Sequence, residues 1–432
     1  MFRFISVILF IVICHRANAQ TLIYNAEYDS IMQQEERYDS VVLEAIQEFN
    51  ASFSKRDYPR IINLLEEAIQ IDDTNATTHY YLGYAYSGLN AQNSRKDTFP
   101  NRNKELCIKA SNEMQKVIAL DSNFGAKLTL SPYSKITSEW GSLALRYIYF
   151  NKIDSVKWAL QQGREKGGFN NFMLAYHRAL INQCDKNAII FSYGEDSFWN
   201  LLYLQYAENY IPNKLSIIDL GLLNTIWYQD LLNKEYNIHF TKSKKNIHKY
   251  YLVSYSDTLF SVPIRQSNSA YLWSFESHGS NPFYLLYGDI AFRNILFENR
   301  FRRPIYFTKG FPIEYTHNLY ANFENQLIID RFNPFEKSEM NDDNFYKLAS
   351  KTLDLAPLHN KNSKEEKQFI DIIRMGIARR MLYDWSSEND LENARHLMKL
   401  IRAKTPSEKY PYQNESQRII MNQLKRVIME DY

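Results

Sequence analysis

Residues 66–89, with the sequence EEAIQIDDTNATTHYYLGYAYSGL, constrain the fold more than any other stretch of this chain. They read as the end of one helix, a tight turn and the start of a second helix. Apolar residues recur at helical spacing before the turn at 72–75, and Thr74 or Asn75 can cap the helix that follows. Gly83 and Ala85 are small where a neighbouring helix must approach closely. The stretch therefore predicts a seam between tightly packed helices.

This seam resembles the tetratricopeptide repeat (TPR) family at its consensus positions. The resemblance rests on the Leu82-Gly83 pair, on Tyr86 three residues further along, and on Ala68 late in the preceding helix. Asp73 stands where the family has proline. TPR arrays are binding surfaces rather than reaction centres. The resemblance implies a helical array over residues 28–184 with about three repeats, near the minimum for a stable stack.

Two further features of this array follow from the residues. A polar stretch that includes a proline predicts a loop over 90–105, inserted between the two helices of one repeat. A later unit has Trp140 on one helix face, a turn at 151–152 and Gly163 on the next helix. The inserted loop is either a binding element or an evolutionary accident, and the sequence leaves both open.

The first 19 residues predict an export signal that is cleaved after residue 19. Arg3 precedes an apolar stretch at 4–14 that is too short to span a bilayer comfortably, and Ala-Asn-Ala follows at 17–19. The alternative is an uncleaved membrane anchor. Cleavage leaves Cys107 and Cys184, and two separate packed thiols are the favoured interpretation, although spacing alone does not decide whether they pair. The expected location is the periplasm or the outside of the cell.

Charge and motifs exclude several classes of function. Lys and Arg number 51 against 49 Asp and Glu, so no net field favours nucleic acid or an anionic membrane. The chain has no phosphate-binding glycine loop, no dinucleotide fingerprint, no HExxH zinc motif and no GxSxG nucleophile motif. We therefore expect no cofactor and no metal, and we assign no catalytic residue.

The pattern changes at residue 185, where an α/β domain is expected to begin and to extend to 335. Short apolar runs at 188–191 and 215–220 predict buried strands, and each is followed by a helical pattern. A strand-helix-strand-helix order predicts a parallel pair with a crossover helix. Further strands are expected at 250–254, 304–307 and 326–329, and a further helix at 289–298.

This domain resembles the soluble extracytoplasmic part of bacterial membrane glycosyltransferases of the protein O-mannosyltransferase-like kind. The resemblance is carried by NAIIFSYGEDSFWNLLYLQYAEN at 187–209, LSIIDLGLLNTIWYQDLL at 215–232 and RRPIYF at 302–307. In that family the chemistry belongs to the membrane part, so the resemblance implies the accessory domain and not the enzyme. Glu195-Asp196 stands where the family has an Asp-Asn-Asp run, which puts a ligand role of that turn in question.

The candidate ligand site follows the two predicted parallel strands. In open α/β sheets, ligands sit beyond the carboxyl ends of the strands. Five residues lie just after the two strands and combine carboxylate, amide and aromatic groups, as in a carbohydrate or peptide site: Glu195, Asp196, Asn224, Trp227 and Tyr228. The alternative is structural, with the two carboxylates serving the N-terminus of the next helix and the Trp side chain in the core.

The C-terminal segment, 344–432, predicts a TPR-like helical hairpin. Its helices are expected at 365–383 and 390–403 around a turn at 384–389, with a last helix at 416–429, and polar linkers are expected at 337–343 and 359–364. His278 and His317 are interpreted as solvated side chains in loops. The expected fold class is mixed: an N-terminal α-helical TPR-like solenoid, a central α/β domain with a partly parallel sheet, and this hairpin.

These observations favour an exported, non-catalytic interaction protein of the cell envelope. Its expected partner is a protein or a component of glycan assembly, with no nucleic acid and no integral membrane segment after cleavage. The alternative is a carbohydrate-active enzyme that uses carboxylates at the strand ends of the α/β domain.

Overall fold

A computed structural model of the chain describes most of its residues, and all structural statements below refer to this part. The described ranges are 32–94, 99–210, 215–240, 250–253, 259–264, 270–274, 283–311, 313–335, 340–361, 363–386 and 390–429. The expected export signal and His278 lie outside them. The chain forms two compact units, which are described separately: residues up to 93 with 105–124, and residues 94–104 with everything from 125 onward.

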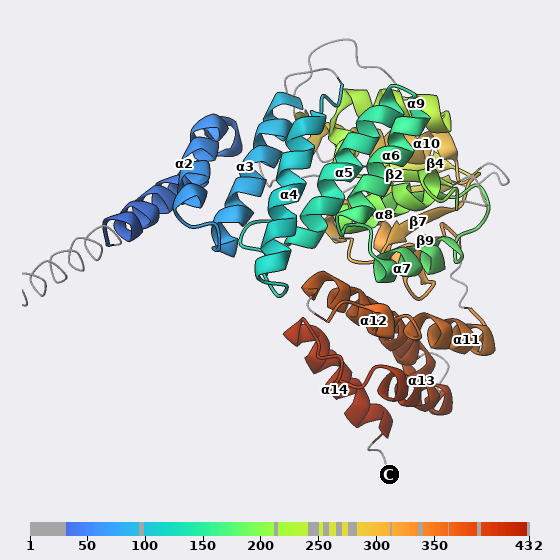
Figure 1. Cartoon of the computed structure of the whole chain (residues 1–432). Helices are drawn as coiled ribbons and strands as arrows, with labels where there is room; N and C mark the ends of the chain where they lie inside the picture. The colour runs from blue at the N-terminus through green and yellow to red at the C-terminus, as the bar shows by residue number, and fades with distance from the viewer. Residues whose placement is uncertain are drawn as a thin grey trace, which may run out of the picture. The chain divides into compact units, whose positions relative to one another are not determined.

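The first unit is helical (Figure 1). Residues 32–48 are helical, followed by α2 (Tyr58–Ile71), α3 (Ala76–Ser94) and α4 (Lys104–Leu120). Asn75 caps α3, because its Oδ1 accepts a hydrogen bond from the backbone N–H of Thr77 at 2.9 Å. The loop expected from residue 90 is wrong at its start, since α3 continues to Ser94. Asn90 is only 1% exposed, and burial of its helical face extends α3 beyond what the polar sequence indicated.

The seam residues pack where the sequence placed them. Ala68, Leu82 and Tyr86 are buried. A Cβ on Gly83 would lie 2.6 Å from Met114 Cε and 3.1 Å from the Ala110 carbonyl oxygen, so only glycine permits this approach of α3 to α4. The predicted close contact of two helices at Gly83 is confirmed.

The second unit begins with three helices, α5 (Pro132–Tyr149), α6 (Ile153–Glu165) and α7 (Asn171–Ile181). The predicted turn between α5 and α6 is confirmed, and Asn151 adopts a left-handed φ of 55° there. Trp140 is fully buried on α5. Cys107 in the first unit and Cys184 in the second are buried thiols and form no disulfide with each other.

A five-stranded mixed sheet forms the centre of the second unit, in the order β2-β1-β7-β9-β8. The predicted parallel pair is confirmed: β1 (Ile189–Ser192) pairs in parallel with β2 (Ser216–Asp219), and α8 (Glu195–Tyr206) is the crossover. β7 (Ile305–Thr308) is parallel to β1 on its other side. β9 (Ile329–Phe332) and β8 (Phe323–Asn325) complete the sheet as antiparallel strands.

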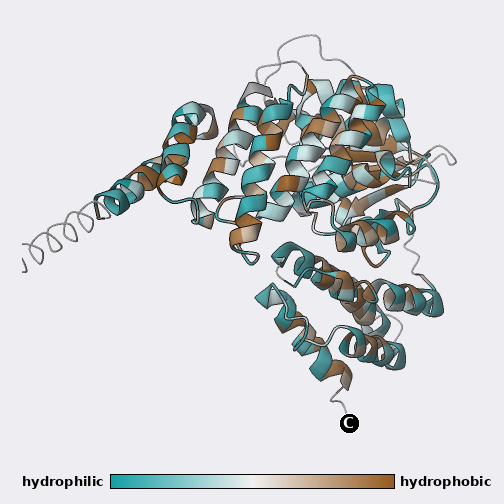
Figure 2. Cartoon of the chain, in the orientation of Figure 1, coloured by the Kyte–Doolittle hydropathy of each residue, from teal (hydrophilic) through white to brown (hydrophobic). Residues whose placement is uncertain are grey.

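Helices cover the sheet, and aromatic side chains of its strands pack against side chains of these helices. α5 and α6 pack together, and α5 also packs against α8, which contacts β2 (Figure 1). Phe191 of β1 lies 4.7 Å, between ring centroids, from Phe292 of α10 (Tyr287–Asn299). In Figure 2 the helices carry hydrophobic and hydrophilic residues side by side, as expected when one face of each helix is buried. None of the helices in the described ranges is long and apolar enough to cross a bilayer.

Several smaller elements were not predicted or lie elsewhere than predicted. The strand expected at 326–329 is wrong in position, because Gln326 to Ile328 form the turn between β8 and β9 and Leu327 has a φ of 76°. The strand expected at 250–254 is confirmed as β3 (Tyr250–Val253), which pairs antiparallel with β6 (Phe283–Leu286). A second antiparallel pair, β4 (Leu259–Pro263) with β5 (Ala270–Ser274), was not predicted. The remaining elements are α9 (Ile226–Tyr236), η1 (Phe53–Lys55), η2 (Leu222–Asn224), η4 (Ile313–Thr316), η5 (Leu319–Asn322) and η6 (Ala356–Leu358).

The C-terminal helices are α11 (Asp342–Leu353), α12 (Lys364–Ser386), α13 (Leu391–Lys404) and α14 (Glu415–Met429). The turn expected at 384–389 is wrong at its start, since α12 runs to Ser386; Asp384 is buried in the helix and accepts a hydrogen bond from Arg380 Nε at 2.6 Å. The linker expected at 337–343 ends earlier, because Asn341 caps α11. The expected hairpin of α12 and α13 and the last helix are confirmed.

Candidate functional site

A cavity of about 160 Å³ opens at the carboxyl ends of β1 and β2, where the sequence placed the candidate site. Tyr193 and Leu220, the residues that follow these two strands, both line it. We call it the β1–β2 cavity. Its lining residues are Tyr193, Leu220, Gly221, Asn224, Leu286, Gly288, Asp289, Phe292, Tyr315 and His317.

The polar groups of the β1–β2 cavity hold one another in place. Asn224 Oδ1 accepts a hydrogen bond from the Gly288 N–H at 2.8 Å, which joins the end of η2 to the start of α10. A Cβ on Gly288 would lie 2.8 Å from the same oxygen, so this contact depends on glycine. Asp289 accepts from the Leu286 N–H at 2.6 Å, and its other oxygen lies 3.3 Å from His317 Nε2. The cavity is therefore preformed.

An aromatic pair borders the β1–β2 cavity. The rings of Tyr193 and Tyr315 are stacked, with centroids 5.2 Å apart and an interplanar angle of 27°. Tyr193 is 37% exposed, so one of its faces or edges remains accessible to a ligand. Partial burial, together with the neighbouring Tyr315, raises the pKa of the Tyr193 phenol. Tyr193 therefore stays neutral at physiological pH, and the stacked pair offers a flat surface for binding a ligand.

Asp219, at the end of β2, is a titratable group that the sequence reading missed. Burial raises the pKa of its carboxyl to about 7, and the charge of Glu195 adds to this, while the backbone N–H groups of Leu222 and Gly221 oppose it. Its Oδ1 accepts from the Leu222 N–H at 2.9 Å. Its place as the final residue of an apolar predicted strand was the signal that could have identified it, because a carboxylate there is both buried and close to the strand end.

Asp196 does not line the β1–β2 cavity with Asn224, because the first turn of α8 places its side chain against α5. Its Oδ1 accepts a hydrogen bond from Ser134 Oγ of α5 at 2.8 Å, and it lines a small space of about 10 Å³ together with Glu366 of α12. Burial raises the pKa of Asp196 to about 6 and that of Glu366 to about 7. Glu195 is exposed in the first turn of α8, where a negative charge is favourable.

We expect the free energy of unfolding to fall as the pH rises from about 4.5 to 7, in part because of Glu366. Its folded pKa lies above its ordinary value of 4.5, so the folded state holds the proton in this window and the unfolded state does not. In Glu366→Gln this part of the slope should disappear. Urea unfolding at several pH values measures the slope. Exposed Glu392 on α13 supplies the control Glu392→Gln, and equal slopes in both variants would contradict the expectation.

The two aromatic residues of the predicted site have other surroundings. Trp227 is half-buried, with its ring edge-on to Tyr149 of α5 at 6.2 Å. Tyr228 is 1% exposed, and its hydroxyl oxygen accepts from the Asp219 N–H at 2.9 Å. Of the five predicted residues, only Asn224 lines the β1–β2 cavity.

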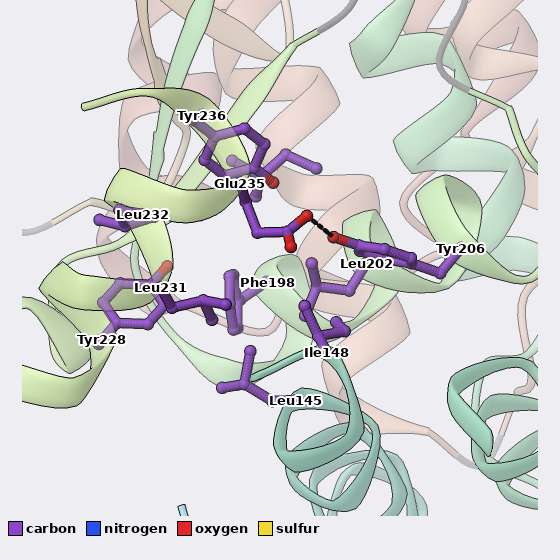
Figure 3. A pocket seen from close by; sticks show the side chains of 11 residues that line it. Leu145, Ile148, Phe198, Leu202, Tyr206, Tyr228, Leu231, Leu232, Glu235 and Tyr236 are labelled. Carbon is purple, nitrogen blue, oxygen red and sulfur yellow. Dashed lines mark hydrogen bonds between the residues drawn. The ribbon is translucent and has the colours of Figure 1, made fainter. Parts of the chain in front are cut away.

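Tyr228 instead lines a narrow space of about 10 Å³ between α5, α8 and α9 (Figure 3). Figure 3 shows apolar side chains around this space and the Glu235 carboxylate pointing toward Tyr206, whose hydroxyl donates to it at 3.0 Å. Burial raises the pKa of Tyr206. The space is too small for a ligand larger than a water molecule, so we assign it to packing.

His317 is the clearest difference from the sequence interpretation. It was interpreted as solvated, but it is only 2% exposed and lies against Asp289 and the ring of Phe292. Its φ of 47° turns the chain, and its carbonyl oxygen accepts from Trp273 Nε1 at 2.6 Å. A lone His in a polar loop carries no signal of burial, because its partners come from α10 and β5. The predicted helix at 289–298 did contain a usable signal for the site, because it began with Asp289, a carboxylate at a helix start.

Comparison with protein-family models, with curated proteins and with solved structures found no match to this chain. Among the described residues, no three His, Cys, Asp or Glu side chains gather in a way that could hold a metal ion.

Proposed function

We propose that this chain is an exported, non-catalytic interaction protein of the cell envelope, with a TPR-like helical array and a ligand site in its α/β domain. The observation that carries the proposal is the preformed β1–β2 cavity. Asn224 and Asp289 are each fixed by backbone N–H groups, and a stacked tyrosine pair borders the opening. Small-ligand sites combine such fixed polar groups with aromatic surface.

The ligand that suits this cavity best is a sugar ring of a glycan-assembly component. A tyrosine face binds the apolar face of a sugar, and the amide of Asn224 is a partner for its hydroxyl groups. The resemblance of 187–232 to glycosyltransferase accessory domains supports the same class of ligand. A protein partner at the helical array is the second part of the proposal, and it is supported by the resemblance of the seam to TPR repeats.

Replacing Tyr193 by alanine should weaken binding of envelope oligosaccharides about tenfold, the effect of one lost aromatic contact. Isothermal titration calorimetry with oligosaccharides from the native envelope measures this. Tyr346→Ala is the matched control, because Tyr346 on α11 is 39% exposed, similar to Tyr193, and does not line the cavity. Equal losses in both variants, or no loss in Tyr193→Ala, would contradict the proposed site.

A carbohydrate-active enzyme is the second candidate, and Asp219 favours it. A carboxyl whose pKa is raised to about 7 beside the charge of Glu195 is the arrangement expected of a general acid. Turnover of a glycan by the purified protein, abolished in Asp219→Asn, would replace the non-catalytic proposal. Binding without turnover supports the interaction protein.

A further inference from the structure

A second cavity, of about 280 Å³, lies at the carboxyl end of β7. We call it the β7 cavity. Its walls come from the end of β7, the loop after it, β8, β9 and α12. The residues that matter for its chemistry are Thr308, Lys309, Phe311, Tyr320, Asp330 and Arg379. It shares no lining residue with the β1–β2 cavity. Its volume is near the lower end of the range for small-ligand sites and is suited to a molecule with a single ring.

Two cations and one carboxylate meet in the β7 cavity. Lys309 Nζ and Arg379 Nη1 both contact Asp330 Oδ1, the guanidinium at 2.9 Å, and Lys309 also donates to Asn325 Oδ1 at 3.1 Å. The side chains of Lys309 and Asp330 are 10% and 11% exposed. The lining therefore carries an excess of one positive charge in a partly desolvated place, where an anion is attracted more strongly than in water.

Arg379 has donors to spare. A guanidinium has five N–H donors in a planar fork, and Arg379 uses one of them, on Asp330. Its other donors make no hydrogen bond to any residue that the structure describes. The side chain is 46% exposed, so an incoming ligand can reach it. The unused N–H donors of this planar group can bind the oxygens of a carboxylate.

Thr308 supplies an independent observation. Thr308 lines the cavity and is 2% exposed, and its buried Oγ1 has no hydrogen-bond partner among the described residues. Burying a hydroxyl without a partner is unfavourable, and such a group in a folded protein calls for an explanation. A polar ligand atom in the cavity would satisfy it.

From these observations we propose that the β7 cavity binds a small organic carboxylate of about the size of one sugar ring. The carboxylate contacts Arg379 and Lys309, Thr308 Oγ1 meets a polar atom of the ligand, and Phe311 and Tyr320 contact its ring. A single negative charge balances the excess charge of the site, whereas a phosphate dianion would overcompensate it. This site goes beyond the proposed function, since it lies outside the β1–β2 cavity and selects for charge.

Titration calorimetry of the purified chain with glucuronate, glucose and inorganic phosphate tests the proposal. We expect saturable binding of glucuronate and much weaker binding of glucose, because only the former carries a carboxylate. Arg379→Gln should weaken glucuronate binding by tenfold or more, as expected for a charged hydrogen bond. Thr308→Val keeps the shape of the side chain and should weaken binding about fivefold while leaving the protein as stable as before, or more so.

Arg402→Gln is the matched control, because this substitution removes the same charge. Arg402 is exposed on α13 and does not line the cavity. This variant should bind glucuronate as the unaltered chain does, and thermal melts should show that all three variants are folded. Three results would overturn the proposal: no saturable binding of glucuronate at millimolar concentration, tighter binding of phosphate than of glucuronate, or unchanged affinity in Thr308→Val and Arg379→Gln.

Discussion

Gly376→Ala is expected to lower the free energy of unfolding by about 3 kcal/mol or more, the upper range for overpacking a core. A Cβ at this position would lie 2.0 Å from the carbonyl oxygen of Leu327. The obstacle is backbone, and it cannot rotate away. Leu327 is fully buried and holds a left-handed φ of 76°, so the turn has little freedom to shift. Asn325 Nδ2 also donates to the Gly376 carbonyl oxygen at 2.8 Å, and this bond ties β8 to α12.

The sign of this effect separates tertiary packing from local preference. Alanine is a better helix former than glycine by about 1 kcal/mol, so helix propensity alone predicts stabilisation. Gly125→Ala is the control, because nothing lies within 4 Å of a Cβ there, and its effect should be within about 0.5 kcal/mol. Urea unfolding measures both. A Gly376→Ala variant as stable as the unaltered chain would show that α12 does not pack on the β8–β9 turn in solution.

Arg374→Met should destabilise the chain by about 3–5 kcal/mol, the cost of breaking a buried ion pair from one side. Arg374 is fully buried on α12 and bonds to Asp371 Oδ1 at 2.9 Å. Its guanidinium also donates to the carbonyl oxygens of Thr405 and Tyr410, at 2.6 and 2.7 Å. One side chain therefore holds the segment between α13 and α14 against α12. Without it, two carbonyl groups and a carboxylate lose their partner together.

A second substitution separates the charge from the packing. Burial already raises the pKa of Asp371 despite the opposing effect of Arg374, so removing the cation leaves an unfavourable buried carboxylate. Arg374→Met combined with Asp371→Asn should recover part of the loss. Arg402→Met, at an exposed site on the neighbouring helix, should change stability by no more than about 0.5 kcal/mol. If the double variant is no more stable than Arg374→Met, the lost carbonyl contacts account for the effect.

Sequence patterns predicted three strands of the central sheet, and their burial is continuous. β1, β2 and β7 are buried at every residue, so their apolar runs stand out. β5 has one buried residue in five and gives no such signal. The sequence predicts a strand across 326–328, where the structure has a turn. Leu327 holds a left-handed φ there without being glycine, and only contacts far away in the sequence fix it. Turns of this kind are specified by tertiary packing.

The location of the candidate site could be predicted from the sequence, but most of its lining residues could not. Parallel strands put their carboxyl ends at one edge, and the β1–β2 cavity lies at that edge. Asn224 belongs to it because η2 follows β2 directly. Asp196 does not, because its position in the first turn of α8 directs it to Ser134. The side chains of a first helical turn face a cavity or a neighbouring helix according to how that neighbour packs. Here the neighbour of α8 is α5, and a short sequence window does not contain that information.

One loop borders both cavities, and this has a thermodynamic consequence. The chain between β7 and β8 contributes Tyr315 and His317 to the β1–β2 cavity, and Thr316 and Tyr320 to the β7 cavity. A ligand that restricts this loop from one side reduces the conformational entropy left to lose when the other side is filled. Linkage is reciprocal, so each ligand would change the affinity for the other by the same factor. The binding of two chemically different ligands would then be coupled through the loop that lines both cavities.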